Sequence, residues 1–309
     1  MLKNIIRALR LPFLTASLLP FIFGSLIWRR HFNFFGFLLG LLAAIATHLS
    51  ANLINDYADS KSGADWQDKN FYKFFGGSKL IQTKVFSEKF YLGAAILCGL
   101  VSLISVILLA FVLKTWVVLG FYLAIIFLSW QYSAKPFRFS YHRVGEFIIF
   151  LLFGPAFVMG WYFIQTKIFP DLKSFILSLP FGFLTTAILF VNEIPDYADD
   201  HKAKKHTWVS ITGVKHAFIF YYFLILAAFV SILGGILKGY LGLFACFSLI
   251  PALFAIKTAN ILNKFSDNKL QLMKSSQLTI IQQTTISLIL IIDIILWPEL
   301  LLQARVLPD

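Results

Sequence analysis

The stretch GFLLGLLAAIATHLSANLINDYADSKSGAD, residues 36–65, passes from an uninterrupted apolar run into a cluster of acidic and amide side chains. An apolar run of about 20 residues is long enough to cross a bilayer as a helix. In the polar part, five positions recur at intervals of three or four residues: His48, Asn52, Asp56, Asp59 and Gly63. Residues at this spacing share one helix face. The stretch therefore predicts a membrane span that ends in a polar stripe, provided that the helix continues that far.

The apolar pattern recurs through all 309 residues. Hydrophobic residues make up 59% of the chain and charged residues 14%, whereas soluble domains carry about 25% charged residues. Apolar segments in lipid must be helical because their backbone groups need internal hydrogen-bond partners. We therefore expect an all-α, polytopic membrane protein with a single domain over residues 1–309 and no low-complexity linker. Nine transmembrane helices are predicted, at 11–28, 36–56, 90–112, 115–133, 144–165, 174–194, 217–236, 240–260 and 278–298.

The net charge of +12 has a sided distribution. With the N-terminus in the cytoplasm, 20 of the 27 lysines and arginines fall on the cytoplasmic side of the nine spans and seven on the other. This asymmetry is the one that the positive-inside rule expects. The charge therefore indicates a multi-pass membrane protein with a cytoplasmic N-terminus, in the inner (plasma) membrane if the cell is prokaryotic. Because this sided distribution accounts for the excess of basic residues, we expect no nucleic acid partner.

A second acidic cluster, NEIPDYADDHKAKK at residues 192–205, repeats the Asn-x-x-x-Asp opening of the first, with Pro195 predicted to interrupt the helix. Both clusters end inward-running spans, where the helix macrodipole disfavours negative charge. In one interpretation, nearby lysines alone compensate the acids, and each cluster is a solvated mixture of charges at the membrane interface. Alternatively, the acids hold Mg²⁺, which takes oxygen ligands and bridges a diphosphate that Lys and Arg neutralise. We favour the second interpretation because both inner loops combine acids with basic residues.

A cation-coupled membrane transporter is the competing class, since intramembrane acids and internal repeats also mark ion carriers. However, the two Asn-x-x-x-Asp copies lie four spans apart and so share one orientation, whereas many carriers use inverted repeats. The acids also lie at one membrane face rather than at the midplane. Both features favour a site that receives a charged substrate from the cytoplasm, and a purely structural scaffold would need neither cluster.

These motifs resemble the UbiA superfamily of intramembrane prenyltransferases, and within it the 1,4-dihydroxy-2-naphthoate polyprenyltransferase (menaquinone) branch. Two further stretches carry the resemblance, GGSKLIQTKVFS at residues 76–87 and YSAKPFRFSYHRVGE at residues 132–146. Gly63 stands where the ubiquinone branch has a further Asp. His201 and Lys204 depart from the family pattern of Arg and Gly, which leaves the expected diphosphate clamp more dependent on Lys, a point charge.

The resemblance implies a nine-helix UbiA-type bundle that transfers a polyprenyl group from an allylic polyprenyl diphosphate to an aromatic acceptor. The expected acceptor is 1,4-dihydroxy-2-naphthoate, in menaquinone biosynthesis, or another quinone precursor such as 4-hydroxybenzoate or homogentisate. The implied cofactor is Mg²⁺, with the ligands Asn52, Asp56, Asp59, Asn192, Asp196 and Asp200. The sequence leaves the prenyl chain length and the oligomeric state open.

The resemblance also implies roles for residues around the metal. The diphosphate would be bound by Lys79, Lys135, Arg138 and Lys205. His48 would contact the acceptor, and the ring of Tyr132 would stabilise the allylic carbocation. Asp65 and Asp199 are candidates for orienting or deprotonating the acceptor hydroxyl.

Overall fold

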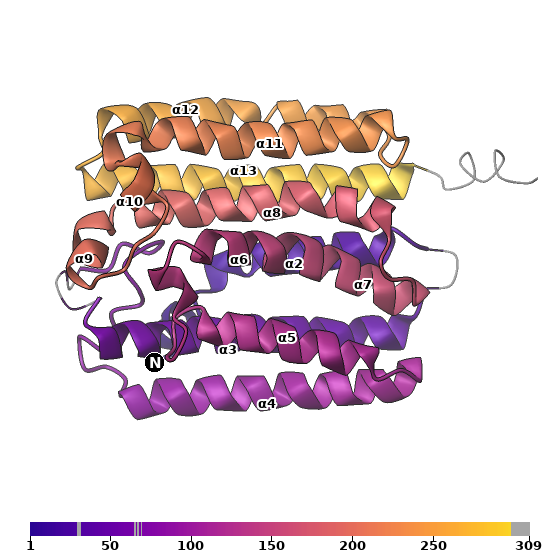
Figure 1. Ribbon diagram of the computed structural model, residues 1–309, viewed down its shortest axis with the longest axis horizontal. Helices are drawn as coiled ribbons and strands as arrows, with labels where there is room; N and C mark the ends of the chain where they lie inside the picture. The colour runs from indigo at the N-terminus through magenta and orange to yellow at the C-terminus, as the bar shows by residue number, and fades with distance from the viewer. Residues whose placement is uncertain (30–31, 65, 67, 69, 298–309) are drawn as a thin grey trace, which may run out of the picture.

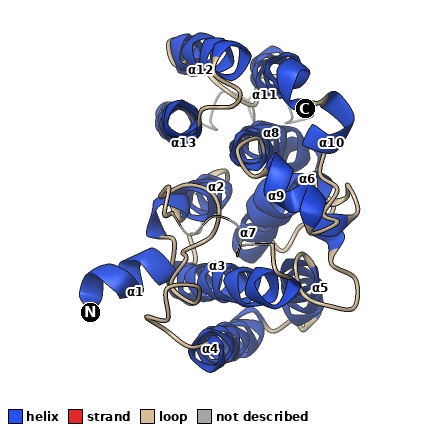
Figure 2. Ribbon diagram, turned by 90° about the vertical axis from the view of Figure 1, so that its left-hand side faces the viewer, coloured by secondary structure: helices blue, strands red, loops and turns tan. Residues whose placement is uncertain are grey.

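The computed structural model describes residues 1–29, 32–64, 66, 68 and 70–297, and within these ranges it contains helices and loops but no strand (Figure 1). Most helices run side by side along one direction, and Figure 2 views them end-on. The α-helices are α1 Leu2–Ala8, α2 Thr15–Leu26, α3 Phe34–Ser62, α4 Glu88–Leu113, α5 Val117–Gln131, α6 Gly145–Leu151, α7 Phe157–Thr166, α8 Leu172–Glu193, α9 Tyr197–Lys202, α10 Val209–Thr212, α11 Ala217–Leu237, α12 Ala252–Lys264 and α13 Lys269–Leu296. Short helices of other types are η1 Leu11–Phe13, η2 Phe139–Tyr141, η3 Leu152–Ala156, η4 Val214–His216 and η5 Leu243–Leu249.

The predicted helical membrane fold is confirmed. Seven helices among the described residues are long and apolar enough to cross a membrane, and an eighth is added if α1 and η1–α2, bent by 47°, form one span. The remaining predicted span corresponds to α5, which has only 15 residues. The nine-span count, the cytoplasmic N-terminus and the single domain therefore stay predictions.

The long loops and the N-terminus gather at one end of the bundle, on the left of Figure 1. This end holds loop 63–87 between α3 and α4 and the segment with α9 and α10 between α8 and α11. Short connections join α4 to α5 and α7 to α8 at the opposite end. Both acidic clusters consequently lie at the same end of the molecule, although more than 120 residues separate them in the sequence.

Helix α3 continues through the first acidic cluster, as the polar stripe requires. It begins after Asn33, whose side chain accepts a hydrogen bond of 2.8 Å from the Gly36 N–H. It ends after Ser62 because Gly63 takes a φ of +87°, a left-handed conformation that glycine adopts without strain. The last four turns of α3 thus present the motif on a regular helical surface.

The predicted helix break at Pro195 is also confirmed. Helix α8 ends at Glu193 and α9 begins at Tyr197, since proline cannot donate a backbone hydrogen bond and clashes with the preceding turn. Asp196 therefore stands in the turn between the two helices, and Asp200 follows on α9.

The predicted start of the last span, at residue 278, is wrong by nine residues, because α13 begins at Lys269. Its first turns are rich in polar residues, which lowered the apolar signal. Ser275 and Ser276 are nevertheless buried, and their hydroxyls donate to the carbonyl of Leu272 at 2.7 and 3.2 Å. Hydroxyls that bond to the helix's own backbone can be buried at little cost, so the polar sequence does not prevent packing.

Four hydrophobic clusters among the described residues form the core. The largest joins α2, α7, α8, α11, α12 and α13, and the next joins α3, α4, α5 and α7. Two smaller clusters lie around Tyr91 and around Phe74. Helices α2 and α7 lie between α3–α5 on one side and α8 with α11–α13 on the other when the bundle is viewed end-on (Figure 2). The cavity described below is lined by residues of α2, α3, α5, α7 and α8.

Candidate active site

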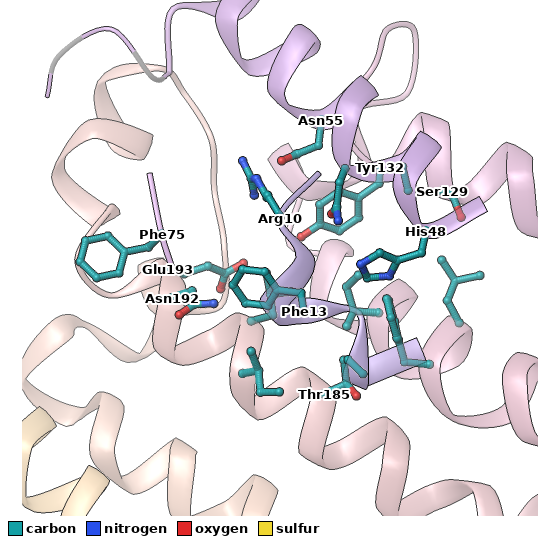
Figure 3. Close-up of a pocket in the computed structure, with 18 of the residues that line it drawn as sticks. Arg10, Phe13, His48, Asn55, Phe75, Ser129, Tyr132, Thr185, Asn192 and Glu193 are labelled. Carbon is teal, nitrogen blue, oxygen red and sulfur yellow. The ribbon is translucent and has the colours of Figure 1, made fainter. Parts of the chain in front are cut away.

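A cavity of about 230 Å³ extends from the end with the long loops into the bundle. Its inner lining is apolar, and includes Ala16, Ile125, Ile149, Leu152, Phe153, Phe157, Ile188 and Leu189. Its polar lining includes Arg10, Asn52, Asn55, Asp59, Tyr132, Asn192, Glu193, Asp196, Asp200 and Lys205. Figure 3 shows Arg10, Tyr132, Asn192 and Glu193 around this space, contributed by different parts of the chain. The cavity thus has a charged mouth and an apolar interior.

The first acidic motif presents Asn52, Asn55 and Asp59 to this cavity. Both Asp59 oxygens have protein contacts: Asn55 Nδ2 donates to Oδ2 at 3.2 Å, and the Tyr141 hydroxyl lies 3.2 Å from Oδ1. The Tyr141 hydroxyl also lies 2.6 Å from Ser62 Oγ. These neutral contacts orient the Asp59 carboxylate without cancelling its charge.

Asp56, predicted as a magnesium ligand, does not line the cavity. Its Oδ1 forms an ion pair with Arg10, and its Oδ2 accepts a hydrogen bond of 3.1 Å from the Ser78 N–H. The side chain is 3% exposed. This carboxylate therefore connects the N-terminal segment and loop 63–87 to α3. Within the polar stripe, Asp56 makes contacts inside the protein, whereas Asp59 lines the cavity.

The second motif contributes Asn192 from the end of α8, Asp196 from the turn and Asp200 from α9. The Gly76 N–H donates to Asp196 Oδ2 at 2.8 Å, in a loop where Gly76 has a φ of +71°. Burial raises the pKa of Asp196, although Lys205 opposes the shift. Loop 63–87 is thereby attached to the second motif as well as the first.

Lys205 supplies the main positive charge beside the second motif. Its Nζ lies 3.3 Å from Asp200 Oδ2 and 6.0 Å from the centre of the Tyr141 ring. Burial raises the pKa of Asp200 to about 7, against the opposing influence of Lys205. Burial removes the water that would solvate the ionised Asp200 carboxylate, so a cation bound beside it would stabilise its charge.

Tyr132 lines the cavity at the end of α5. A phenol is ordinarily uncharged at neutral pH, so its ring offers a neutral aromatic face.

A shallower pocket lies next to the mouth and shares Asp196, Asp200 and Gly76 with it. Here Lys269 Nζ lies 2.9 Å from Asp68 Oδ2 and 3.6 Å from Asp199 Oδ2. Burial alone would raise the pKa of Asp68, but hydrogen bonds from Lys269 and the Asn70 N–H lower it to about 2. Lys269 thus links loop 63–87, α9 and α13 by charge. Asp199, a predicted acceptor-orienting residue, belongs to this pocket and not to the cavity.

The other predicted residues differ in position. Lys79 is buried and lines the shallower pocket. Lys135 is exposed and lines neither space, while the guanidinium of Arg138 stacks 4.2 Å from the centre of the Tyr141 ring. His48 lines the cavity, and its Nδ1 lies 2.7 Å from Ser17 Oγ. Asp65 lies outside the described residues.

Sequence reasoning overlooked Arg10, Asn55, Glu193 and Lys269. In the sequence, Arg10 stands out only as a basic residue near the N-terminus, although Pro12 two residues later indicates a break that can turn a side chain inward. Asn55 and Glu193 stand within the two motifs, next to the predicted ligands Asp56 and Asn192.

Glu146, near the start of α6, accepts a hydrogen bond from the Trp208 N–H. This bond fixes the segment that follows Lys205.

The residues at the mouth fit a magnesium ion that binds together with a substrate. No three His, Cys, Asp or Glu side chains among the described residues lie close enough to hold a metal alone. However, Mg²⁺ usually binds one or two carboxylates and completes its octahedron with waters and phosphate oxygens. Asn192 Oδ1 is buried at the cavity and has no hydrogen-bond partner among the residues that the structure describes. An oxygen donor of this kind, beside Asp196 and Asp200, matches the preference of Mg²⁺.

The chain is similar to proteins of one family. The UbiA prenyltransferase family model matches residues 17–277. The UbiA prenyltransferase domain-containing protein 1 of Dictyostelium discoideum is 27% identical over 275 residues, which covers 87% of this chain and 81% of that protein. The 1,4-dihydroxy-2-naphthoate octaprenyltransferase of Bacillus subtilis is 26% identical over 272 residues, with 86% and 85% covered.

A solved structure shares the fold. The UbiA homolog from Archaeoglobus fulgidus bound to DMAPP and Mg²⁺ superposes with a TM-score of 0.61 at 17% identity, covering 91% of this chain and 98% of that one. A family model that spans most of the chain, on a helical bundle with an acidic mouth, leads to one conclusion: the protein belongs to the UbiA prenyltransferase family and is a prenyltransferase.

Proposed function

We propose that this prenyltransferase joins an allylic polyprenyl diphosphate to an aromatic acceptor, and that the acceptor is 1,4-dihydroxy-2-naphthoate. The observation that carries the proposal is the shared cavity, in which Asp59 of one motif and Asp196 of the other face a single space with an apolar interior. A substrate with an anionic head and an isoprenoid tail matches both ends of such a cavity.

The diphosphate head would lie at the mouth. Asn52, Asp59, Asn192, Asp196 and Asp200 would hold Mg²⁺ there, and the ion would supply the positive charge that turns diphosphate into a leaving group. Asp56 would not be among these ligands, because Arg10 and the Ser78 N–H engage both of its oxygens.

The chain's own cations would complete the neutralisation. Lys205 and Arg10 line the mouth, and Lys79 lies in the adjoining pocket. When the allylic C–O bond breaks, its electron pair leaves with the diphosphate. Positive charges fixed beforehand at that position stabilise the separating anion without reorganisation.

The remaining allylic cation needs an electron-rich and dry environment. The neutral ring of Tyr132 offers its negative face to the cation, and the apolar lining excludes the water that would hydrolyse it. A π electron pair of the acceptor ring then forms the new C–C bond, and the displaced ring substituent leaves as a proton or as carbon dioxide. The acceptor-orienting roles considered for Asp65 and Asp199 stay predictions.

The choice of acceptor rests on the relatives and on one side chain. Several relatives are 1,4-dihydroxy-2-naphthoate octaprenyltransferases. His48 Nε2 is buried, faces the cavity lining and has no hydrogen-bond partner in the described part of the chain. It can therefore bond to an acceptor hydroxyl. The active site would lie at the cytoplasmic face if the distribution of basic residues sets the orientation.

The test offers several acceptors to the purified protein in liposomes with geranylgeranyl diphosphate and Mg²⁺. We expect mass spectrometry to detect prenylated naphthoate product and a phosphate assay to detect diphosphate release. A product formed only with 4-hydroxybenzoate or homogentisate would overturn the acceptor. Ion flux without diphosphate release would overturn the proposed transfer.

A further inference from the structure

A second, smaller cavity of about 80 Å³ adjoins the cavity of the candidate active site. Thr47, Ile125 and Phe157 belong to the lining of both, so these three side chains form a waist between the two spaces. The second cavity lies among α3, α4, α5 and α7, on the side of the waist away from the acidic mouth.

The second cavity presents an almost wholly apolar surface, with Ala43, Ala44, Val106, Leu109, Val118, Phe121, Phe163 and Ile164 in its wall. The hydroxyls in its lining are already bonded. Thr47 donates to the Ala43 carbonyl at 2.8 Å, and Tyr122 donates to the Gly99 carbonyl at 3.2 Å. An occupant of this cavity therefore gains dispersion contacts and removes its apolar surface from water. It finds few polar partners there. This selects an aliphatic chain.

The distance along α3 fits a long tail. Asp59 at the mouth and Ala43 in the second cavity are 16 residues apart on this helix, which corresponds to a rise of roughly 24 Å. A diphosphate held at the mouth reaches the second cavity only when its tail contains several isoprene units, so short tails would end before the waist.

Gly160 stands at the centre of the α7 face that lines the second cavity. The other lining residues of this helix and its start are Ala156, Phe157, Trp161, Phe163 and Ile164. At 100° per residue, these positions spread on both sides of Gly160. A Cβ added at Gly160 would meet no atom within 4 Å. Any side chain at this position therefore projects into the empty space.

We propose that the second cavity receives the distal isoprene units of the donor, and that Gly160 is the position that sets the longest chain accepted. This inference rests on the proposed transferase function. A larger side chain at residue 160 fills the cavity and excludes long tails, while the mouth and the waist keep their shape for short ones.

The experiment measures kcat/KM of Gly160→Ala, Gly160→Val and Gly160→Leu with geranyl, geranylgeranyl and octaprenyl diphosphates. We expect values for geranyl diphosphate to stay within about twofold of the wild type. Values for octaprenyl diphosphate should fall in steps with side-chain size, on the order of tenfold or more for Gly160→Leu. Gly120→Leu is the matched control, because Gly120 is exposed on α5, its added Cβ also meets no atom within 4 Å, and it lines neither cavity.

The possible results separate the two claims. An unchanged octaprenyl-to-geranyl ratio across the series, or an equal loss for every chain length, would overturn the role of Gly160. Activity with geranyl diphosphate shows in each variant that the fold is kept. If the wild type transfers no prenyl group of any length to any aromatic acceptor, the proposed function itself fails.

Discussion

Arg10, in the bend between α1 and η1, forms an ion pair with Asp56 on α3, 46 residues later in the chain. One turn further along α3, Asp59 faces the cavity instead. The two carboxylates of the first motif therefore have different environments: one is neutralised by the protein, and the other is oriented by Asn55 and Tyr141 towards a shared space.

Replacing Asp56 should act mainly on stability. Asp56→Asn removes the carboxylate charge that pairs with the partly buried Arg10 guanidinium, and the cost should be about 2 kcal/mol. Thermal unfolding in detergent measures the effect. Combining Asp56→Asn with Arg10→Met should restore part of the loss, because both charges are then removed. An unchanged melting temperature in the single variant would contradict this role.

Tyr141 should act through Asp59. Tyr141→Phe removes the hydroxyl that lies 3.2 Å from Asp59 Oδ1 and keeps the ring beside Arg138 and Lys205. Because hydrogen bonds to charged groups contribute more than neutral ones, we expect kcat/KM to fall on the order of tenfold. Steady-state kinetics with a saturating acceptor provides the measurement. If kcat/KM stays at the wild-type value, Tyr141 has no part in orienting the carboxylate.

Lys269 should influence the capture of the diphosphate. Lys269→Ala leaves Asp68 and Asp199 without the ammonium that lies 2.9 and 3.6 Å from them, which adds net negative charge beside the mouth. Pairs that are partly exposed contribute little, so kcat/KM should fall only roughly threefold. The loss should shrink at high salt, since ions screen exposed charges. Lys264→Ala, at an exposed position at the end of α12, is the control. An effect independent of salt would argue against a charge mechanism.

Asp293 should be structural. Its carboxylate accepts hydrogen bonds of 2.8 Å from the N–H groups of Gly242 and Ala245 at the start of η5, at the end of the bundle away from the acidic mouth. Asp293→Ala removes the carboxylate that accepts from both N–H groups and leaves the Ala245 N–H only a longer bond of 3.3 Å to the Gly242 carbonyl. This loss should cost roughly 2 kcal/mol. The melting temperature should drop while kcat of the folded fraction stays unchanged. A specific loss of kcat would instead connect Asp293 to the reaction.

The helical bundle could be predicted because apolar runs of sufficient length have one stable form in lipid. The same rule failed at the start of α13, where Ser275 and Ser276 are buried with their hydroxyls bonded to the helix backbone. Hydropathy depends only on the type of side chain. It does not depend on whether the fold gives the polar group a hydrogen-bond partner.

The two acidic motifs could be identified from the sequence, but the role of each residue in them could not. Asp56 and Asp59 are three residues apart, so both fit one helical stripe, and only the position of Arg10 distinguishes them. That position depends on the bend before η1, where Arg10 adopts a left-handed conformation with a φ of 48°. A contact across 46 residues leaves no trace in the local pattern of either segment.

We propose that carboxylates of both motifs act together on one magnesium-bound diphosphate. The most direct measurement is prenyl transfer by Asp59→Asn and Asp196→Asn in liposomes, with Mg²⁺ and with EDTA, beside Asp267→Asn as an exposed control. We predict that each of the two site variants loses on the order of a hundredfold or more in kcat/KM, as does the wild type with EDTA, while the control keeps its activity. Wild-type transfer by either Asp59→Asn or Asp196→Asn would contradict the account.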